Sequence, residues 1–229
     1  MAFGNRSGGR NYGPNAKLYY FKLKSKDLPE PVFEVKRKVV KDGKDDFEVV
    51  DPAARFVEGD LIEIANKEFK HDKKTIRSVT ATLRDGDDYY FVGIPHTYLG
   101  RNILNSLLAL KTFEGVQIGV YQSKPKPDPK DPKVMRPGFA SSAVRQNGEL
   151  VYGKFEKDKL PAIPKVKVGD QFFSDDSKIT EHFIKEVAEF QKVLKGAQPA
   201  ATAAASGPAS HEPDTPEDEG EPGTPKLPF

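Results

Sequence analysis

Aromatic and basic side chains alternate along several segments of this 229-residue chain. A single strand of nucleic acid exposes the faces of its bases, and aromatic rings can stack on these faces whatever the base sequence. Lysine and arginine side chains beside the rings neutralise phosphates and release their counterions. We therefore expect these segments to form a site for single-stranded nucleic acid. The candidate residues are Tyr19, Lys22, Phe33, Lys36, Arg37, Lys38, Arg77, Arg84, Tyr89, Tyr121, Lys124, Lys126, Tyr152 and Lys154.

The competing interpretation places the aromatic rings in the core. Neighbouring side chains on a strand point to opposite faces, so at least one ring of the segment 19–21 must point inward. Phe21 and Phe91 lack a hydroxyl group and are the better core candidates. Tyr152 is the preferred stacking residue, because it lies in a polar segment beside Lys154.

Residue types that serve catalysis or metal binding do not gather in this sequence. There is no cysteine, and the four histidines stand in unlike contexts without metal-ligand spacing. No Gly-rich phosphate loop and no Gly-x-Ser-x-Gly nucleophile elbow is present. The acidic clusters at 45–46 and 85–88 coincide with expected hairpin turns, where such residues are common. We expect no enzyme, no cofactor and no metal site.

The last 34 residues, from Gly196 to Phe229, differ in charge from the rest of the chain. They contain six acidic residues and one basic residue, so residues 1–195 hold the other 35 bases and 28 acids. A basic body suits nucleic acid, and an acidic tail can occupy the same surface until nucleic acid displaces it. The apolar tip of the freed tail can then enter a pocket of a partner protein, although an inert solubilising tail is the alternative. The tail residues assigned to partner binding are Asp218, Glu219, Glu221, Leu227, Pro228 and Phe229.

Composition divides the chain into three parts. We expect residues 1–16 to be a flexible, basic, Gly-rich arm, residues 17–195 to form the folded domain, and residues 196–229 to be a disordered acidic tail. No apolar run is long enough for a membrane span or a signal peptide. We therefore expect a cytoplasmic protein that does not contact membranes.

The first half of the domain reads as strands followed by one helix. From Thr97 onward the apolar residues no longer alternate as in a strand but recur with the period of a helix. The helix is expected to begin at the N-cap Thr97 and to end near Leu110. Pro52 is expected to end one strand, and turns are expected at 42–44, 58–60 and 85–86. The expected strands are 18–23, 32–40, 47–50, 61–64, 75–83, 89–92 and 116–121.

The second half contains two loops, a hairpin and a helix. Five prolines exclude regular structure from 123–138, and 159–171 is also expected to be irregular. Asn147-Gly148 predicts a type I′ hairpin between 139–145 and 149–155. A C-terminal helix begins after an N-cap within 175–177 and ends at Gly196. Its apolar stripe, which should pack on the strands or on a neighbouring copy, is Ile179, Phe183, Val187, Phe190 and Leu194.

This element order predicts a mainly β protein. Seven or eight short strands at regular spacing favour a small closed barrel with elaborations. We expect an elaborated OB-fold barrel with one internal helix and one C-terminal helix.

The tail resembles that of bacterial and tailed-phage single-stranded DNA-binding proteins, through its acidic residues and its tip Leu227-Pro228-Phe229. Residues 17–195 are similar in layout to phage single-stranded DNA-binding proteins with an OB-fold, through 59–64, 104–121 and the hairpin 141–152. The resemblance implies sequence-independent binding, protection of DNA during phage replication or recombination, and recruitment of replication or recombination proteins. It also implies a location in the host cytoplasm.

Two alternatives to this hypothesis stay open. One is a module of similar fold that binds RNA or duplex DNA. The other is an adaptor that uses its acidic tail and has no nucleic-acid site. Self-association on DNA and the oligomeric state are left open by the sequence.

Overall fold

The computed structural model describes residues 12, 15–24, 30–71, 74–129, 131, 133–136, 138–168 and 171–197, with the backbone alone at 71, 74, 126, 136 and 168. The chain divides into two units, Met1–Gln198 and Pro199–Phe229, and all described residues belong to the first. The acidic part of the tail and most of the N-terminal arm therefore lie outside the described residues. Within the described part, no helix is long and apolar enough to cross a membrane.

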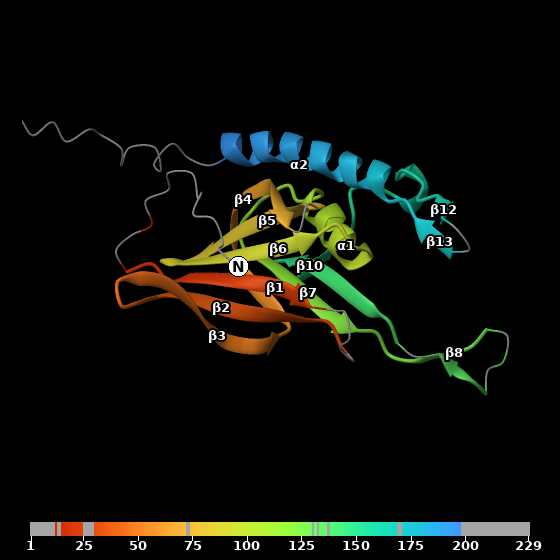
Figure 1. Ribbon diagram of the computed structural model, residues 1–229, viewed down its shortest axis with the longest axis horizontal. Helices are drawn as coiled ribbons and strands as arrows, with labels where there is room; N and C mark the ends of the chain where they lie inside the picture. Colours follow the sequence, from red (N-terminus) through yellow and green to blue (C-terminus); the bar gives the residue numbers. More distant parts are fainter. Residues whose placement is uncertain are drawn as a thin grey trace, which may run out of the picture. The chain divides into compact units, whose positions relative to one another are not determined.

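The dominant element is a mixed nine-stranded sheet (Figure 1). Its order is β11-β10-β7-β4-β5-β6-β1-β2-β3, with β1 parallel to β6 and every other pair antiparallel. The prediction of a mainly β chain is confirmed, but the pairing leaves β11 and β3 as edges and does not close a barrel. The strands are β1 (Leu18–Lys24), β2 (Val32–Lys41), β3 (Lys44–Ala54), β4 (Phe56–His71), β5 (Lys74–Asp85), β6 (Asp88–Pro95), β7 (Val116–Gln122), β10 (Ala140–Gln146) and β11 (Glu149–Val151).

Three predicted hairpins are confirmed. Asn147 and Gly148 have φ values of 51° and 84°, as a type I′ turn requires, and they join β10 to β11. Asp42 and Gly43, at 51° and 71°, join β2 to β3 in the same way. Gly86, at 56°, lies in the turn between β5 and β6.

The turn predicted at 58–60 is wrong, because these residues belong to the long strand β4. The first part of β4 pairs with β7 through Phe56–Gly59, and the remainder pairs with β5 from Asp60 onward. A Cβ atom on Gly59 would lie 2.8 Å from the backbone oxygen of Arg84. The glycine therefore allows β4 to lie close to β5 where it changes partner.

Three local predictions about irregular segments also fail. Pro52 does not end its strand, because β3 is an edge strand and can lack one donor. The Pro-rich loop contains two short paired strands, β8 (Lys126–Pro127) and β9 (Met135–Arg136). The segment 159–171, expected to be irregular, follows a 3₁₀ turn, η1 (Lys157–Lys159), and contains the first strand of a second small hairpin, Lys165–Val168.

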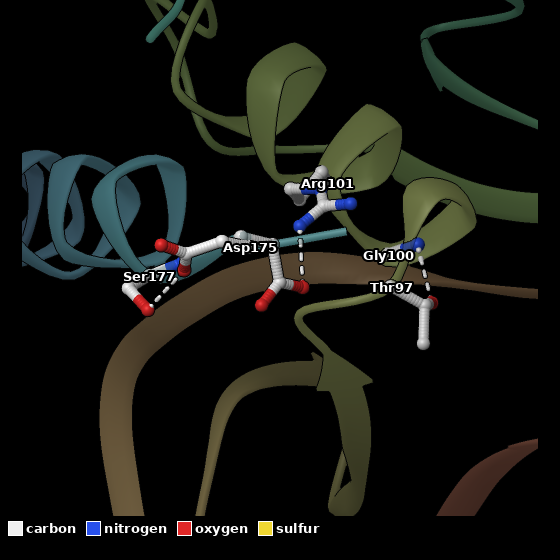
Figure 2. Close-up of polar contacts among 6 residues, drawn as sticks. Thr97, Gly100, Arg101, Asp175 and Ser177 are labelled. Carbon is white, nitrogen blue, oxygen red and sulfur yellow. Dashed lines mark hydrogen bonds and ion pairs between the residues drawn. The ribbon is translucent and has the colours of Figure 1, made fainter. Parts of the chain in front are cut away.

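The two helices confirm the predicted periodicity. Helix α1 spans Tyr98–Leu107, and the hydroxyl of its N-cap Thr97 accepts a hydrogen bond from the Gly100 amide. Helix α2 spans Ser177–Ala197, and all five residues of its predicted apolar stripe are buried in the common core. The starts of the two helices are joined, because Arg101 of α1 forms an ion pair of 3.1 Å with Asp176, just before α2. Figure 2 shows Arg101 of α1 close to Asp175 and Ser177 at the start of α2.

Candidate nucleic-acid interface

Strands β5, β6, β1 and β2 have one face in the core and one face away from it. Val79, Ala81 and Leu83 of β5 are fully buried, and the cross-strand partners Val92 and Ile94 of β6 lie with them. Side chains alternate along each strand, so the intervening residues form the opposite face, here called the outer face. By register it comprises Thr80, Thr82, Arg84, Tyr89, Phe91, Gly93, Tyr20, Lys22, Lys24, Glu34, Lys36, Lys38, Phe47 and Val49.

Aromatic rings form a continuous series across the outer face, here called the aromatic row. The rings of Phe91 on β6 and Tyr20 on β1 are stacked, with centroids 4.9 Å apart and an interplanar angle of 18°. Tyr20 also meets Phe47 of β3 edge-on at 5.1 Å. At the other end, Tyr12 lies edge-on to Tyr89 at 4.8 Å and to Phe91 at 6.0 Å. All five side chains are half-buried, so each retains some ring surface toward solvent.

Basic side chains lie beside the aromatic row on the same face. Lys36 is 3.7 Å from Glu34, and Lys38 is 2.7 Å from Asp45. Both ion pairs are partly exposed, so a phosphate from solvent can compete with the carboxylate for each lysine. In the described part of the chain, Lys22 and Arg84 form no ion pair. The outer face can therefore supply several cations to a nucleic-acid backbone.

Two pKa shifts describe the electrostatics of this face. Burial, followed by the charge of Asp45, raises the pKa of the Tyr20 hydroxyl, so this ring stays uncharged at neutral pH. The hydrogen bond from Lys24 lowers the pKa of the Glu34 carboxyl, with further lowering by the positive charges of Lys36 and Lys22. Glu34 is therefore ionised at neutral pH, and it pairs with Lys24 of β1 and Lys36 of β2.

The outer face collects only part of the residue set proposed from the sequence. Five of the proposed residues lie on it, because each belongs to β1, β2, β5 or β6 and its position in the strand directs its side chain away from the core. These five are Lys22, Lys36, Lys38, Arg84 and Tyr89.

Three proposed residues lie on the core side of the sheet. Phe33 is 0% exposed and packs edge-on against Phe21, so its proposed role in base stacking is wrong. Its strand phase places it opposite Leu23, in the middle of the core. Tyr19 and Arg37 are the other two residues and are cross-strand partners. The ring of Tyr19 packs against that of Tyr90, with centroids 5.5 Å apart. Arg37 donates a hydrogen bond to Glu48, which raises the pKa of Arg37.

A shallow cavity of about 330 Å³ lies on this core side, lined in part by Tyr19, Tyr90 and Phe56. Its charged lining residues are Asp51 and Glu58. Two carboxylates repel phosphate, so the cavity does not suit a nucleic-acid backbone. Tyr19 therefore faces an unfavourable site for this ligand.

The other proposed residues are distributed elsewhere. Arg77 is 3.3 Å from Glu68, at the surface where β5 meets α2. Tyr121 on β7 and Tyr152 after β11 are 46% and 80% exposed, on the opposite side of β4 from β6 in the strand order. Lys154 pairs with Glu186 of α2 at 2.8 Å. Lys124 is exposed, whereas the Lys126 side chain and the six proposed tail residues lie outside the described residues.

Four members of the aromatic row were absent from the proposed set. Phe91 was expected in the core, but it is half-buried on the outer face and contacts Tyr20. Side chains alternate along β6, so Phe91 shares a face with Tyr89 and not with Val92, which pairs with the buried Ala81 on the core side. Tyr20, Phe47 and Tyr12 join the row only through long-range packing.

Comparison with protein-family models, with curated proteins and with solved structures finds no match to this chain. The assignment of function therefore depends on the geometry of the residues themselves.

Proposed function

We propose that this protein binds single-stranded DNA, without sequence preference, on the outer face of β5, β6, β1 and β2. The observation that carries the proposal is the aromatic row with lysines and an arginine beside it on one face. Each ring can stack on any base, and each cation can neutralise a phosphate. The chain acts as a binding protein and not as an enzyme in this proposal.

The connectivity of five strands supports an OB-fold at the centre of the domain. In chain order these strands are β4, β5, β6, β7 and β10, and in the sheet they lie as β10-β7-β4-β5-β6. The long first strand pairs with both the second and the fourth, and α1 lies between the third and the fourth. This is the arrangement expected of a partly open five-stranded Greek-key barrel.

The same comparison favours the outer face as the binding surface. Oligonucleotides bind OB-folds on the face of the second and third strands, which here are β5 and β6. Strand β1 pairs in parallel with the free edge of β6, and β2 and β3 follow it. The N-terminal strands therefore enlarge the proposed surface by adding Tyr20, Lys22 and Phe47.

The tail and the partners remain part of the proposal. A protein that coats exposed DNA protects it during replication or recombination, and an acidic tail can recruit the proteins that act next. RNA is the nearest alternative ligand, because stacking and phosphate contacts do not depend on the 2′-hydroxyl. A duplex is less suitable, because its base faces are hidden from the aromatic row.

The first test is the substitution Phe91→Ala. Loss of a stacking ring should weaken binding to a labelled oligo(dT) by about 1–3 kcal/mol, or roughly 5- to 150-fold in Kd. The oligonucleotide should have about 30 nucleotides, more than the 4–16 that one OB-fold covers. Fluorescence anisotropy measures Kd, and competition with RNA and duplex DNA ranks the alternatives.

Tyr98→Ala is the matched control, because Tyr98 is an aromatic residue that is 65% exposed on α1, outside the outer face. Its affinity for DNA should equal that of the unmodified chain, and circular dichroism should report the same fold for both variants. An unchanged Kd for Phe91→Ala would remove the outer face from the binding site. No binding by the unmodified chain would leave the adaptor alternative.

A further inference from the structure

A small hairpin stands apart from the nine-stranded sheet. Strands β12 (Lys165–Val168) and β13 (Gln171–Ser174) pair with each other as a separate two-stranded sheet (Figure 1). Its base is closed by a hydrogen bond from the Asp175 amide to the Pro164 carbonyl, at 2.9 Å. A two-stranded hairpin is marginally stable by itself, so its anchoring to the rest of the domain matters.

The hairpin exposes two adjacent phenylalanines. Phe172 is 67% exposed and Phe173 is 52% exposed, and they point to opposite faces because they are neighbours on one strand. Phenylalanine is among the side chains most often buried, so two adjacent exposed rings are apolar surface available to a ligand. The two faces differ in what surrounds each ring.

One face combines the ring of Phe172 with two lysines. Phe172 is paired across the strands with Lys167, and Lys165 lies two residues further along, on the same face. Neither lysine forms an ion pair within the described residues. The other face pairs Phe173 with Val166, which is 44% exposed, and is therefore apolar. An exposed ring flanked by two unpaired cations has the chemistry that binds a base and its neighbouring phosphates.

The hairpin is also fixed to the body of the domain. It leads directly into α2, where the carboxylate of Asp175 accepts hydrogen bonds from the amide and the hydroxyl of Ser177. The next residue, Asp176, forms the ion pair with Arg101 of α1 (Figure 2). The base of the hairpin is therefore tied to both helices.

We propose that the face of the β12–β13 hairpin formed by Lys165, Lys167 and Phe172 is a second contact site for single-stranded nucleic acid. The proposal extends the proposed function and depends on it. We infer a nucleic acid as the ligand, because the two lysines of this face complement phosphates and its aromatic ring can stack on a base. A protein partner would be better served by the apolar face.

Adjacent substitutions on opposite faces give a matched test. Phe172→Ala should raise the Kd for an oligo(dT) of about 30 nucleotides by roughly 5-fold or more, whereas Phe173→Ala should leave it unchanged. The double variant Lys165→Gln/Lys167→Gln should weaken binding and make the dependence of Kd on salt less steep. Urea denaturation of each variant checks that the domain is folded.

Crosslinking provides a second measurement, in which the aromatic ring is retained and not replaced by alanine. A photoreactive phenylalanine analogue at position 172 should crosslink to the oligonucleotide, and the same analogue at position 173 should not. Equal crosslinking at both positions, or none at position 172, would overturn the proposal. A change in sedimentation for Phe172→Ala with unchanged DNA affinity would also overturn it, and would make the hairpin a protein contact.

The Phe91→Ala variant separates this proposal from the one on which it depends. If Phe91→Ala weakens binding and Phe172→Ala does not, only the hairpin proposal fails. If the unmodified chain does not bind DNA or RNA, the proposed function itself fails.

Discussion

At the scale of single residues, His96 has both of its ring nitrogens buried. It lies between the end of β6 and the N-cap of α1, and neither ring nitrogen has a hydrogen-bond partner among the described residues. Burial lowers the pKa of the imidazole, the positive charges of Arg101 and Arg77 lower it further, and Asp176 opposes them. The neutral ring is therefore favoured in the folded protein.

The sign of this shift gives a pH prediction. A lowered pKa in the folded state means that the unfolded chain binds the proton more readily, so His96 destabilises the fold as the pH falls below about 6.5. Above that pH the ring is neutral in both states and has no such effect. When the pH is lowered from about 7.5 to about 5.5, the unfolding free energy of His96→Phe should therefore decrease less than that of the unmodified chain. Urea denaturation at both pH values measures this, and equal losses would contradict it.

At the scale of elements, strand β4 links the two parts of the sheet. It pairs with β7 first and then with β5, and a register shift between Leu61 and Glu63 follows the change of partner. Gly59 lies at the change, against the backbone of Arg84. Since Arg84 is on the outer face, the geometry of β4 also positions a cation of the proposed interface.

Two glycine substitutions in this sheet should differ in their effect. Gly59→Ala places a methyl group 2.8 Å from the Arg84 oxygen, so the strands must separate, at a cost of about 1–3 kcal/mol of unfolding free energy. Gly93→Ala is the control, because its added methyl group would be 3.6 Å from the nearest atom, which is ordinary contact. Its unfolding free energy should change by less than about 1 kcal/mol. Equal urea midpoints for the two variants would show that β4 relaxes freely at Gly59.

At the scale of the whole molecule, the separation of charge between body and tail gives a testable prediction. Helix α2 ends at Ala197, so a chain ending at Gln198 keeps every described element and loses the six acidic residues of the tail. It should bind oligo(dT) more tightly than the full chain at low salt, and the difference should shrink above about 0.15 M salt. Contacts from Lys22, Lys36, Lys38 and Arg84 to four phosphates would give a slope of about −3 in log K against log salt.

A full-length variant in which the tail acids are replaced by their amides is the control for this prediction. It keeps the length of the tail and removes its charge, so it should bind as tightly as the truncated chain. Anisotropy titrations over a range of salt concentrations compare the three proteins. Identical affinities at low salt would mean that the tail does not compete for the outer face.

The sequence by itself determined the features that depend on local chemistry. Asn147-Gly148 forms its turn because these two residues tolerate positive φ, and the apolar stripe of α2 is buried because its spacing matches one face of a helix. The N-cap at Thr97 was readable for the same reason. The residue types also predicted a basic, aromatic-rich surface, whose role in binding stays a proposal.

Only the tertiary structure decided which of these residues share a face. Phe33 was expected on the binding surface and is buried, whereas Phe91 was expected in the core and lies on the outer face. The face to which a strand side chain points depends on its position in the strand and on the pairing with the neighbouring strand. Tyr20 meets Phe91 because β1 pairs in parallel with β6, across about 70 residues of chain that no local pattern connects. The strands of the Pro-rich segment and the hairpin with Phe172 were missed because their pairing is too short to create a periodic pattern.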